Sequence, residues 1–323
     1  MDIFIGEKGS IMSFGNLAMI SNRPSLMAAV LAVLVVAAPI GAEETMMLTG
    51  RYAVKGDGEV NTYIFDTGTT IVLIDAQRQL SLAGDVVEVV GDRADRVAAI
   101  LITHPHPDHV GGIDVLRDAF GAPVHASKAT ADEISSDSLG HLAETREMFP
   151  DDTSASPPVI DVIVDQGDVL IFGDLTFDVF VLGPGEAVSS TLYFEPSRQM
   201  LVAGDLFAVG RTPYLVDEHV LDWLRQLDWI AGKFGPDVMV YPGHGKPGTV
   251  AELVPAQKVY LEEFVALVRA ARSDGVVDHD ETESIVEEME VRYPDHTSVA
   301  PMPAPELLRL NIEAVAHELS RAG

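Results

Sequence analysis

The hydrophobic and polar positions of the chain follow two periods, which predict strands and helices in alternation. The runs YIFDTGTTIVLID (63–75) and VAAILIT (97–103) are short and rich in β-branched side chains, which predicts strands. The first run contains the turn signal DTG and therefore predicts a hairpin. After the second run, the apolar residues Ile113, Leu116 and Phe120 recur at the helical spacing i, i+3 and i+7.

The second half of the chain continues this alternation. Five further β-rich runs occur, namely VIDVIV, DVLIF, LTFDVFVL, STLYF and MLVAGD. Apolar residues at helical spacing then predict one helix over 254–272 and one or two more over 280–323, around the break YPDHTSVAPMPAP. Because strands dominate both halves and helices separate them, the pattern predicts two sheets packed face to face and flanked by helices.

Residues 128–157 are polar and irregular, and they separate the two strand-rich halves. Their segment HLAETREMFP predicts a short helix. Two interpretations of this region stay open, because it can be either a lid or substrate loop over a site or an insertion at the surface. Under the first interpretation, we expect His141 to contact the substrate.

The N-terminal 42 residues have the pattern of an export signal. The unbroken apolar run LMAAVLAVLVVAA follows Arg23, and Ala42 is a small residue before a predicted cleavage point. This run is too short to span a bilayer as a helix, and a short membrane anchor or a buried helix is the alternative interpretation. We therefore expect a signal peptide at 1–42, a main domain at 43–273 and a C-terminal helical extension at 274–323. The mature protein should be periplasmic or secreted, without a stable membrane anchor.

The charge balance and the lack of cysteine exclude several classes of protein. Lys and Arg number 21 against 50 Asp and Glu, which gives a net charge of −29. A nucleic-acid-binding protein needs positive charge to neutralise phosphates, so we expect a small-molecule substrate and no nucleic-acid partner. The absence of cysteine excludes disulfides, a thiol nucleophile and any cysteine metal ligand. The oligomeric state stays open.

The segment LITHPHPDHVGG, residues 101–112, carries the candidate chemistry. It places four potential metal ligands within six positions: His104, His106, Asp108 and His109. Side chains two positions apart in extended backbone point the same way, and the proline after each of the first two histidines favours extended backbone. Neutral imidazoles and a carboxylate are typical ligands of zinc or a similar divalent transition metal rather than calcium. The flanking patterns place this motif on a loop between a strand and a helix.

The spacing His-x-His-x-Asp-His resembles the signature of the metallo-β-lactamase fold superfamily. Three further landmarks match in the same order: Asp75 in VLIDAQ as the buried aspartate after the first hairpin, Asp205 in LVAGDLF as the bridging aspartate, and His244 in YPGHGKPG as the last histidine ligand. The resemblance covers about residues 47–250. It implies an α+β fold, a four-layer αββα sandwich with extra C-terminal helices, and a site for two metal ions at one edge of the sheets.

One position departs from the family pattern. Family members usually carry a histidine nineteen residues before the bridging aspartate, and this chain has Glu186 there. The resemblance then implies that the first metal is bound by His104, His106 and Glu186. It assigns Asp108, His109 and His244 to the second metal, with Asp205 as the bridge. In the alternative, Glu186 reaches the metal only through water, or the first site is weakly occupied.

Glu186 also changes the charge of the predicted site. Two divalent ions carry +4, while Asp108, Asp205, Glu186 and a bridging hydroxide carry −4; a histidine at position 186 would leave +1. A more neutral site is a weaker Lewis acid, so its bound water should ionise at a higher pH. Two histidines and one carboxylate are also the ligand set of non-haem iron oxygenases. We therefore expect two zinc ions per chain, with manganese or iron as alternatives.

The resemblance implies a metallohydrolase, and the N-terminal pattern implies that it is exported. In such an enzyme a hydroxide shared by two metals attacks a carbonyl, and Asp108 orients the hydroxide and shuttles the proton. Esters, lactones and amides, including β-lactams, are the expected substrates. Quorum-signal lactonases usually carry a tyrosine three residues after the bridging aspartate, where this chain has Ala208. Two alternatives stay open: a mononuclear iron oxidoreductase that oxidises persulfides, and a degenerate member that binds metal without catalysis.

Overall fold

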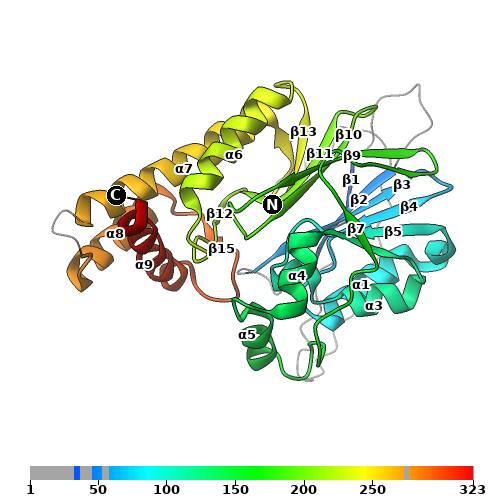
Figure 1. Cartoon of the computed structure of the whole chain (residues 1–323), viewed down its shortest axis with the longest axis horizontal. Coiled ribbons are helices and arrows are strands. Elements are labelled where there is room, and N and C mark those ends of the chain that lie inside the picture. Colours follow the sequence, from blue (N-terminus) through cyan, green and yellow to red (C-terminus); the bar gives the residue numbers. More distant parts are fainter. Residues whose placement is uncertain (1–32, 37–45, 53–57, 273–275, 323) are drawn as a thin grey trace, which may run out of the picture. The chain divides into compact units, whose positions relative to one another are not determined.

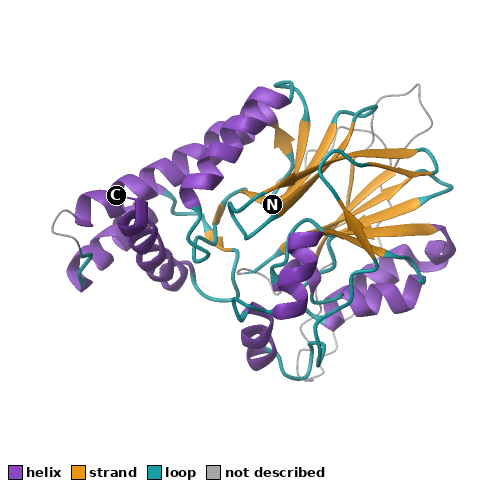
Figure 2. Ribbon diagram, viewed as in Figure 1, coloured by secondary structure: helices purple, strands orange, loops and turns teal. Residues whose placement is uncertain are grey.

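Two β-sheets pack face to face, and helices cover the outer face of each (Figures 1 and 2). The computed structural model describes residues 33–36, 46–52, 58–272 and 276–322. The four-layer αββα arrangement implied by the sequence resemblance is therefore confirmed, together with the extra C-terminal helices.

The first sheet contains seven strands among the described residues, in the order β1 to β7. Its strands up to β4 pair antiparallel, and those from β4 to β7 pair parallel. The bounds are β1 (Val33–Val36), β2 (Met46–Tyr52), β3 (Val60–Asp66), β4 (Ile71–Ile74), β5 (Val97–Leu101), β6 (Val124–Ser127) and β7 (Val162–Val164). The predicted hairpin is confirmed as β3 and β4.

The second sheet contains six strands among the described residues, in the order β14-β13-β11-β10-β9-β8. The bounds are β8 (Val169–Phe172), β9 (Leu175–Leu182), β10 (Ser190–Glu195), β11 (Met200–Ala208), β13 (Met239–His244) and β14 (Gly248–Thr249). A separate pair of short parallel strands joins β12 (Arg211–Thr212) to β15 (Thr297–Ser298). This pair ties the segment after β15 to the segment that follows β11.

The helices fall into two groups that cover opposite outer faces (Figure 1). The first half of the chain contains α1 (Leu80–Val90), the 3-10 helix η1 (Gly91–Arg96), α2 (Pro107–Val110), α3 (Ile113–Phe120), α4 (Lys128–Ser136) and α5 (His141–Met148). The second half contains α6 (Val220–Lys233), α7 (Val250–Ala271), α8 (His279–Arg292) and α9 (Ala304–Ala322). The predicted helices in 254–272 and 280–323 and the short helix in HLAETREMFP are confirmed. No helix in the described ranges combines the length and apolarity needed to cross a membrane.

Alternation along the strands divides the apolar side chains between two environments. Tyr63 and Phe65 of β3 lie in the core between the sheets, where Phe65 packs edge-on against Phe177 of β9 at a ring-centroid distance of 5.3 Å. Ile64, between them in sequence, faces the helices α1 and α3 instead. This is the period-2 pattern expected of strands that are buried on both faces.

The C-terminal helices share a core with the helices of the main domain. Ile285 of α8 and Ile312 of α9 belong to the same apolar cluster as Trp223 of α6 and Leu261 of α7. Trp223 is fully buried, and its indole N–H donates to the carbonyl oxygen of Leu206 at 3.1 Å. The extension predicted at 274–323 is therefore packed against α6 and α7 rather than separate from them.

Two details differ from the sequence-based expectations. VIDVIV, grouped by its position with the second set of runs, forms β7 and pairs with β6 in the first sheet. The HPHPDH motif is not entirely a loop, because Pro107 begins the short helix α2. The predicted signal peptide at 1–42 lies outside the described residues except for Val33–Val36, which pairs with β2 as the edge strand of the first sheet.

Candidate metal centre

The candidate ligands meet where the two sheets come together. His104 and His106 follow the end of β5, Glu186 lies on the loop between β9 and β10, and Asp205 and His244 belong to β11 and β13. The backbone of Thr191 donates to the carbonyl of Thr103 at 2.7 Å and so joins the two sheets beside this point. All seven predicted ligands are buried: His104, His106, Asp108, His109, Glu186, Asp205 and His244.

Prolines and glycines give the ligand loop its conformation. His106 has φ −62° and ψ 144°, the extended backbone expected of a residue before proline, and Pro107 then begins α2. The two glycines that end the motif allow the loop to lie against the segment after β4. A Cβ on Gly111 would lie 1.9 Å from the carbonyl oxygen of Arg78, and one on Gly112 would lie 2.1 Å from that of Ala76. Only glycine fits at these two positions.

A glycine also shapes the part of β11 that carries Asp205. Gly204 has φ +52°, and the pairing of β11 with β13 shifts register on both sides of it. A Cβ on Gly204 would lie 2.7 Å from Oγ1 of Thr103, so the strand approaches the ligand loop closely. The irregular strand thereby brings the Asp205 side chain into the ligand cluster.

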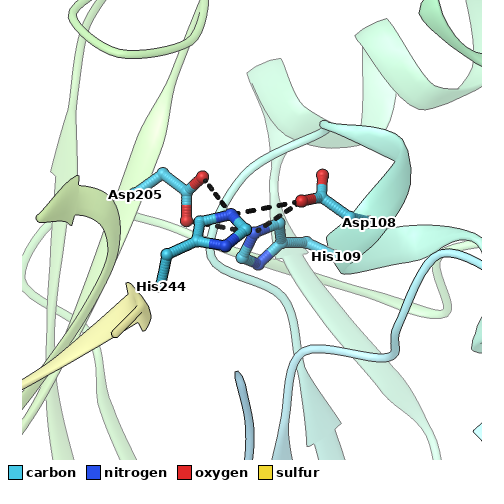
Figure 3. Close-up of side chains that lie close together, drawn as sticks. All are labelled: Asp108, His109, Asp205 and His244. Carbon is cyan, nitrogen blue, oxygen red and sulfur yellow. Dashed lines mark ion pairs between the residues drawn. The ribbon is translucent and has the colours of Figure 1, made fainter. Parts of the chain in front are cut away.

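Four of the ligands lie together: Asp108, His109, Asp205 and His244 (Figure 3). They are called the second cluster here, because they include the residues assigned to the second metal. Nε2 of His109 lies 3.1 Å from Oδ1 of Asp205. Nε2 of His244 lies 3.0 Å from Oδ2 of Asp205 and 3.2 Å from Oδ2 of Asp108. The two rings and the two carboxylates point toward one common position, as Figure 3 shows.

The remaining three ligands form a first cluster, defined here as His104, His106 and Glu186. Oε1 of Glu186 lies 3.0 Å from Nδ1 of His106, and its Oε2 lies 3.6 Å from Nε2 of His104. The structure therefore brings Glu186 to the place that the sequence register predicted. The amide of Gln226 donates to the carbonyls of Gly183 and Pro184 at 2.8 Å and fixes the loop that carries Glu186.

Asp75 sets the tautomers of two of the histidines. Nδ1 of His109 lies 2.8 Å from the Asp75 carboxylate, which can only accept, so this nitrogen carries the proton and leaves Nε2 bare in the neutral ring. The Thr103 hydroxyl donates its single proton to Asp75 at 2.9 Å. Its oxygen therefore accepts from Nδ1 of His104 at 2.9 Å, which leaves Nε2 of His104 bare as well.

The other two histidines are fixed in the same way. Nδ1 of His244 donates to the carbonyl oxygen of Glu59. Nε2 of His106 donates to Oδ2 of Asp217 at 3.2 Å, so in this ring Nδ1 is the bare nitrogen. Each histidine thus presents a lone pair to its cluster, and a protein group holds the opposite nitrogen, which is the arrangement typical of metal-binding histidines.

The buried atoms that face inward have no hydrogen-bond partner among the described residues. They are Nε2 of His104, His109 and His244, both carboxylate oxygens of Glu186, and Oδ1 of Asp205. Buried polar atoms without partners are costly, and a cation at each cluster would satisfy them together. Imidazole nitrogens and carboxylates are suitable ligands for zinc, manganese or iron, so the residues fit the implied pair of metal ions.

The charges of the clusters shift the pKa values of their members. Burial lowers the pKa of His244, but Asp205 and Asp108 outweigh this effect and raise it to about 9. Burial raises the pKa of Glu186 to about 7, although His106 opposes the shift. Burial works against ionisation of Asp108, but Arg78 and the two neighbouring histidines hold its pKa well below its usual range. A metal-free site therefore retains protons that a bound cation must displace.

Three residues that the motif analysis did not name flank the clusters. Arg78 lies 3.1 Å from Oδ2 of Asp108 and is itself buried. Asp217 bridges His106 and His141, accepting from Nε2 of His141 at 2.9 Å. Tyr214 packs edge-on against both histidine rings.

A cavity of about 230 Å³ opens onto the clusters. His106, Asp108 and Asp205 are among the residues that line it, and His141 of α5 contributes to its wall. The region 128–157 thus supplies part of the cavity wall, which favours its interpretation as a substrate loop.

Comparison with protein families places these residues in a known group. The family model described as the metallo-beta-lactamase superfamily matches residues 56–244. This range includes all seven predicted ligands and Asp75. The region beyond residue 244, with α7, α8 and α9, lies outside the matched range.

Two characterised groups of relatives are similar to part of the chain. The metallo-beta-lactamase type 2 of Bacillus cereus is 25% identical over 192 residues, which cover 58% of this chain and 68% of that protein. A hydroxyacylglutathione hydrolase of Bdellovibrio bacteriovorus is 29% identical over 154 residues, which cover 46% of this chain and 52% of that protein. Among solved structures, a beta-lactamase domain protein from Burkholderia ambifaria shares the fold, with a TM-score of 0.64, 18% identity and 88% of each chain covered.

Proposed function

Because the chain belongs to the metallo-beta-lactamase superfamily, we propose that it is an exported hydrolase that binds two zinc ions and cleaves an ester, lactone or amide bond in a small molecule. The observation that carries this proposal is the pair of adjacent buried clusters: their inward-facing atoms lack hydrogen-bond partners among the described residues, and three of their ligands line a cavity. The hydrolases among its relatives, named for β-lactam and hydroxyacylglutathione substrates, support the reaction class.

The residues around the clusters have separable tasks in such a reaction. Two divalent ions would lower the pKa of a bound water and polarise the scissile carbonyl. Asp108, kept ionised beside Arg78, would orient the attacking water and accept its proton. Asp75 holds Thr103 and His109, and Asp217 holds His106, so the ligand nitrogens are aligned before substrate arrives.

Export is the part of the proposal that rests on the N-terminal sequence alone. Cleavage after Ala42 would remove β1, which is the edge strand of its sheet, and would leave β2 as the new edge. Determination of the N-terminal residue of the protein recovered from the periplasm or medium tests this point. A mature N-terminus just after Ala42 supports export, and an intact N-terminus in the cytoplasm contradicts it.

One observation favours a second candidate function. His104, His106 and Glu186 are a set of two histidines and one carboxylate, which suits a mononuclear iron oxidoreductase such as a persulfide-oxidising enzyme. The second cluster argues against it, because four further buried ligands would then have no cation to bind. We therefore rank the hydrolase first.

A substrate panel on metal-loaded protein tests the proposed reaction. The panel contains chromogenic β-lactam, lactone, aryl ester, phosphodiester and sulfate ester substrates, and we expect turnover in the carbonyl classes. Asp108→Ala should lower that turnover by roughly a hundredfold or more, because it removes the group that orients water and accepts the proton. Asp118→Ala, an exposed aspartate on α3, is the matched control and should keep full activity. Oxygen consumption with a persulfide and no hydrolysis in any class would favour the second candidate instead.

A further inference from the structure

The cavity beside the metal centre has a chemically mixed lining. Its ionisable lining residues include the ligands His106, Asp108 and Asp205, which are buried. Its apolar lining residues are Met148, Val216, Val299, Ala300, Pro301, Met302 and Leu310. Val299 lies close to the metal centre, because its carbonyl accepts from Arg78, which also pairs with Asp108. A molecule that fills this space therefore meets both ligand chemistry and hydrocarbon.

The apolar part of the wall is built from segments that are far apart in the sequence. Met148 ends α5, whereas Val299 and Met302 belong to the stretch between β15 and α9. Val299 is buried in a small apolar cluster against which Met302 packs. Asn311 of α9 fixes the adjoining stretch by donating to the carbonyl of Pro213 at 2.9 Å and accepting from the backbone N–H of Leu215 at 2.8 Å. The C-terminal part of the chain is therefore part of the cavity wall.

Two of the apolar lining side chains remain in contact with water and therefore lie at the mouth of the cavity. Met148 is 45% exposed and Leu310 is 41% exposed, although both line the cavity. Apolar surface left open beside a catalytic site gains free energy when a ligand covers it. These side chains thus offer a binding surface that the fold itself does not use.

Charge limits what can bind there. Among the described residues that line the cavity, Arg78 is the only arginine or lysine, and its charge is paired with Asp108. Glu144 adds a carboxylate to the wall. An anionic group in the part of the substrate remote from the metal centre would therefore find no unpaired arginine or lysine in the wall and would meet the carboxylate of Glu144.

We propose that this cavity selects substrates whose arm remote from the scissile bond is uncharged and apolar, such as a medium-length alkyl or an aryl group. The inference rests on the proposed hydrolase function and names its substrate class. Glutathione thioesters and β-lactams carry carboxylates, so they are disfavoured relative to neutral esters and lactones.

Matched methyl esters test the proposal on the zinc-loaded full-length protein. Methyl acetate, butanoate and hexanoate differ only in chain length, and monomethyl adipate is methyl hexanoate with its terminal methyl group replaced by a carboxylate. We expect kcat/KM to rise up to about fourfold for each buried methylene, and methyl hexanoate to exceed monomethyl adipate at least tenfold. A flat series, or a preference for monomethyl adipate, overturns the proposal.

A charge placed at the mouth of the cavity locates the apolar arm of the substrate. Leu310→Lys should reduce the preference for methyl hexanoate over monomethyl adipate at least fivefold, because the new cation pairs with the carboxylate and solvates the wall. Val259→Lys on α7 is the matched control, since Val259 is 49% exposed and lies outside the cavity; it should leave the preference unchanged. Met148 lies on α5, whereas Leu310 lies on α9. Met148→Lys should therefore reduce the same preference at least fivefold. An unchanged preference in both cavity variants overturns the assignment.

A binding measurement separates this inference from the hydrolase proposal. Hexanamide and its terminal-carboxylate analogue, adipic acid monoamide, are titrated into the full-length protein with and without zinc and followed by ligand-observed NMR. We expect tighter binding of hexanamide in both states, and loss of that preference in Leu310→Lys. If no ester is hydrolysed but this preference is found, the reaction is wrong and the cavity inference stands. If esters are hydrolysed and the amides bind equally, the cavity inference is wrong.

Discussion

Asp217 holds Nε2 of His106 at 3.2 Å, while Oε1 of Glu186 lies 3.0 Å from the other ring nitrogen, Nδ1. The second carboxylate oxygen of Asp217 accepts from His141 in the cavity wall. One buried carboxylate therefore fixes the tautomer of a predicted metal ligand and ties that ligand to the substrate side of the site. Burial opposes ionisation of the Asp217 carboxyl group, but the hydrogen bonds from His106 and His141 keep its pKa below its usual range.

Asp217→Asn should weaken metal binding at the first cluster by roughly 10- to 100-fold, the usual effect of losing a group that orients a ligand. The asparagine amide offers one acceptor where two rings now donate, so one ring must rotate. Competition with a chromogenic chelator measures the affinity. Asp222→Asn, a more exposed aspartate on α6, is the control and should not change it. Equal affinities in both variants would show that Asp217 does not position His106.

Metal binding should become tighter as the pH rises from about 6.5 to about 9. In the metal-free chain, Asp205 and Asp108 overcome the effect of burial and raise the pKa of His244 from 6.5 to about 9, so the ring is protonated across much of this range. Because the pKa of His244 is raised on folding, its protonation stabilises the metal-free fold. This stabilisation is fully present below pH 6.5 and is lost as the pH rises through 9. A cation needs the bare nitrogen and must displace that proton.

Burial raises the pKa of Glu186 to about 7, so a cation must displace a proton from this carboxyl group as well. Zinc titrations by calorimetry in buffers of different ionisation enthalpy count the protons released. We expect more than one proton per chain at pH 6.5 and fewer at pH 9. Proton release that is zero at both values would contradict the charge state derived for the clusters.

Glu186→His should move the pH optimum of hydrolysis to lower values. The substitution replaces a carboxylate by a neutral ligand and raises the charge of the loaded site by one, so water at the site should ionise more readily. The pH–rate profile of the loaded variant is compared with that of the natural protein after metal analysis confirms equal loading. An optimum that does not move would rule out the charge argument for Glu186.

Gly243→Ala should damage the second cluster without a comparable effect on folding. The added Cβ would lie 1.7 Å from Oδ1 of Asp205, so the carboxylate must turn away from the cluster. Metal bound per chain should fall, as measured by elemental analysis. Gly84→Ala is the control, since a Cβ there meets nothing within 4 Å and α1 should gain up to about 1 kcal/mol. Full metal content in Gly243→Ala would contradict the placement of Asp205.

The sequence predicted the parts of the site that local patterns encode. His104, His106, Asp108 and His109 lie within one motif, and the prolines in it fix the backbone. Glu186, Asp205 and His244 were identified by their order and spacing relative to a known family, and the structure brings all three to the motif. The hairpin and the α7 helix were predicted because their hydrophobic periods are regular.

The remaining parts depend on contacts that no local pattern encodes. Asp217 reaches His106 across 111 positions of sequence. Met302 reaches the cavity because β15 pairs with β12 and α9 packs on α7, so its position follows from the tertiary fold. The wall of the cavity, and with it the inferred substrate class, therefore required the structure.

Metal content is the most direct test of the central claim that two adjacent clusters each bind one ion. The full-length protein, its Glu186→Ala variant and its His244→Ala variant are loaded with zinc, desalted and measured by inductively coupled plasma mass spectrometry. We predict two zinc ions per chain in the natural protein, and retention of about one in each variant, because each substitution removes a ligand from one cluster only. A single ion per chain in the natural protein that His244→Ala leaves unchanged would contradict the claim.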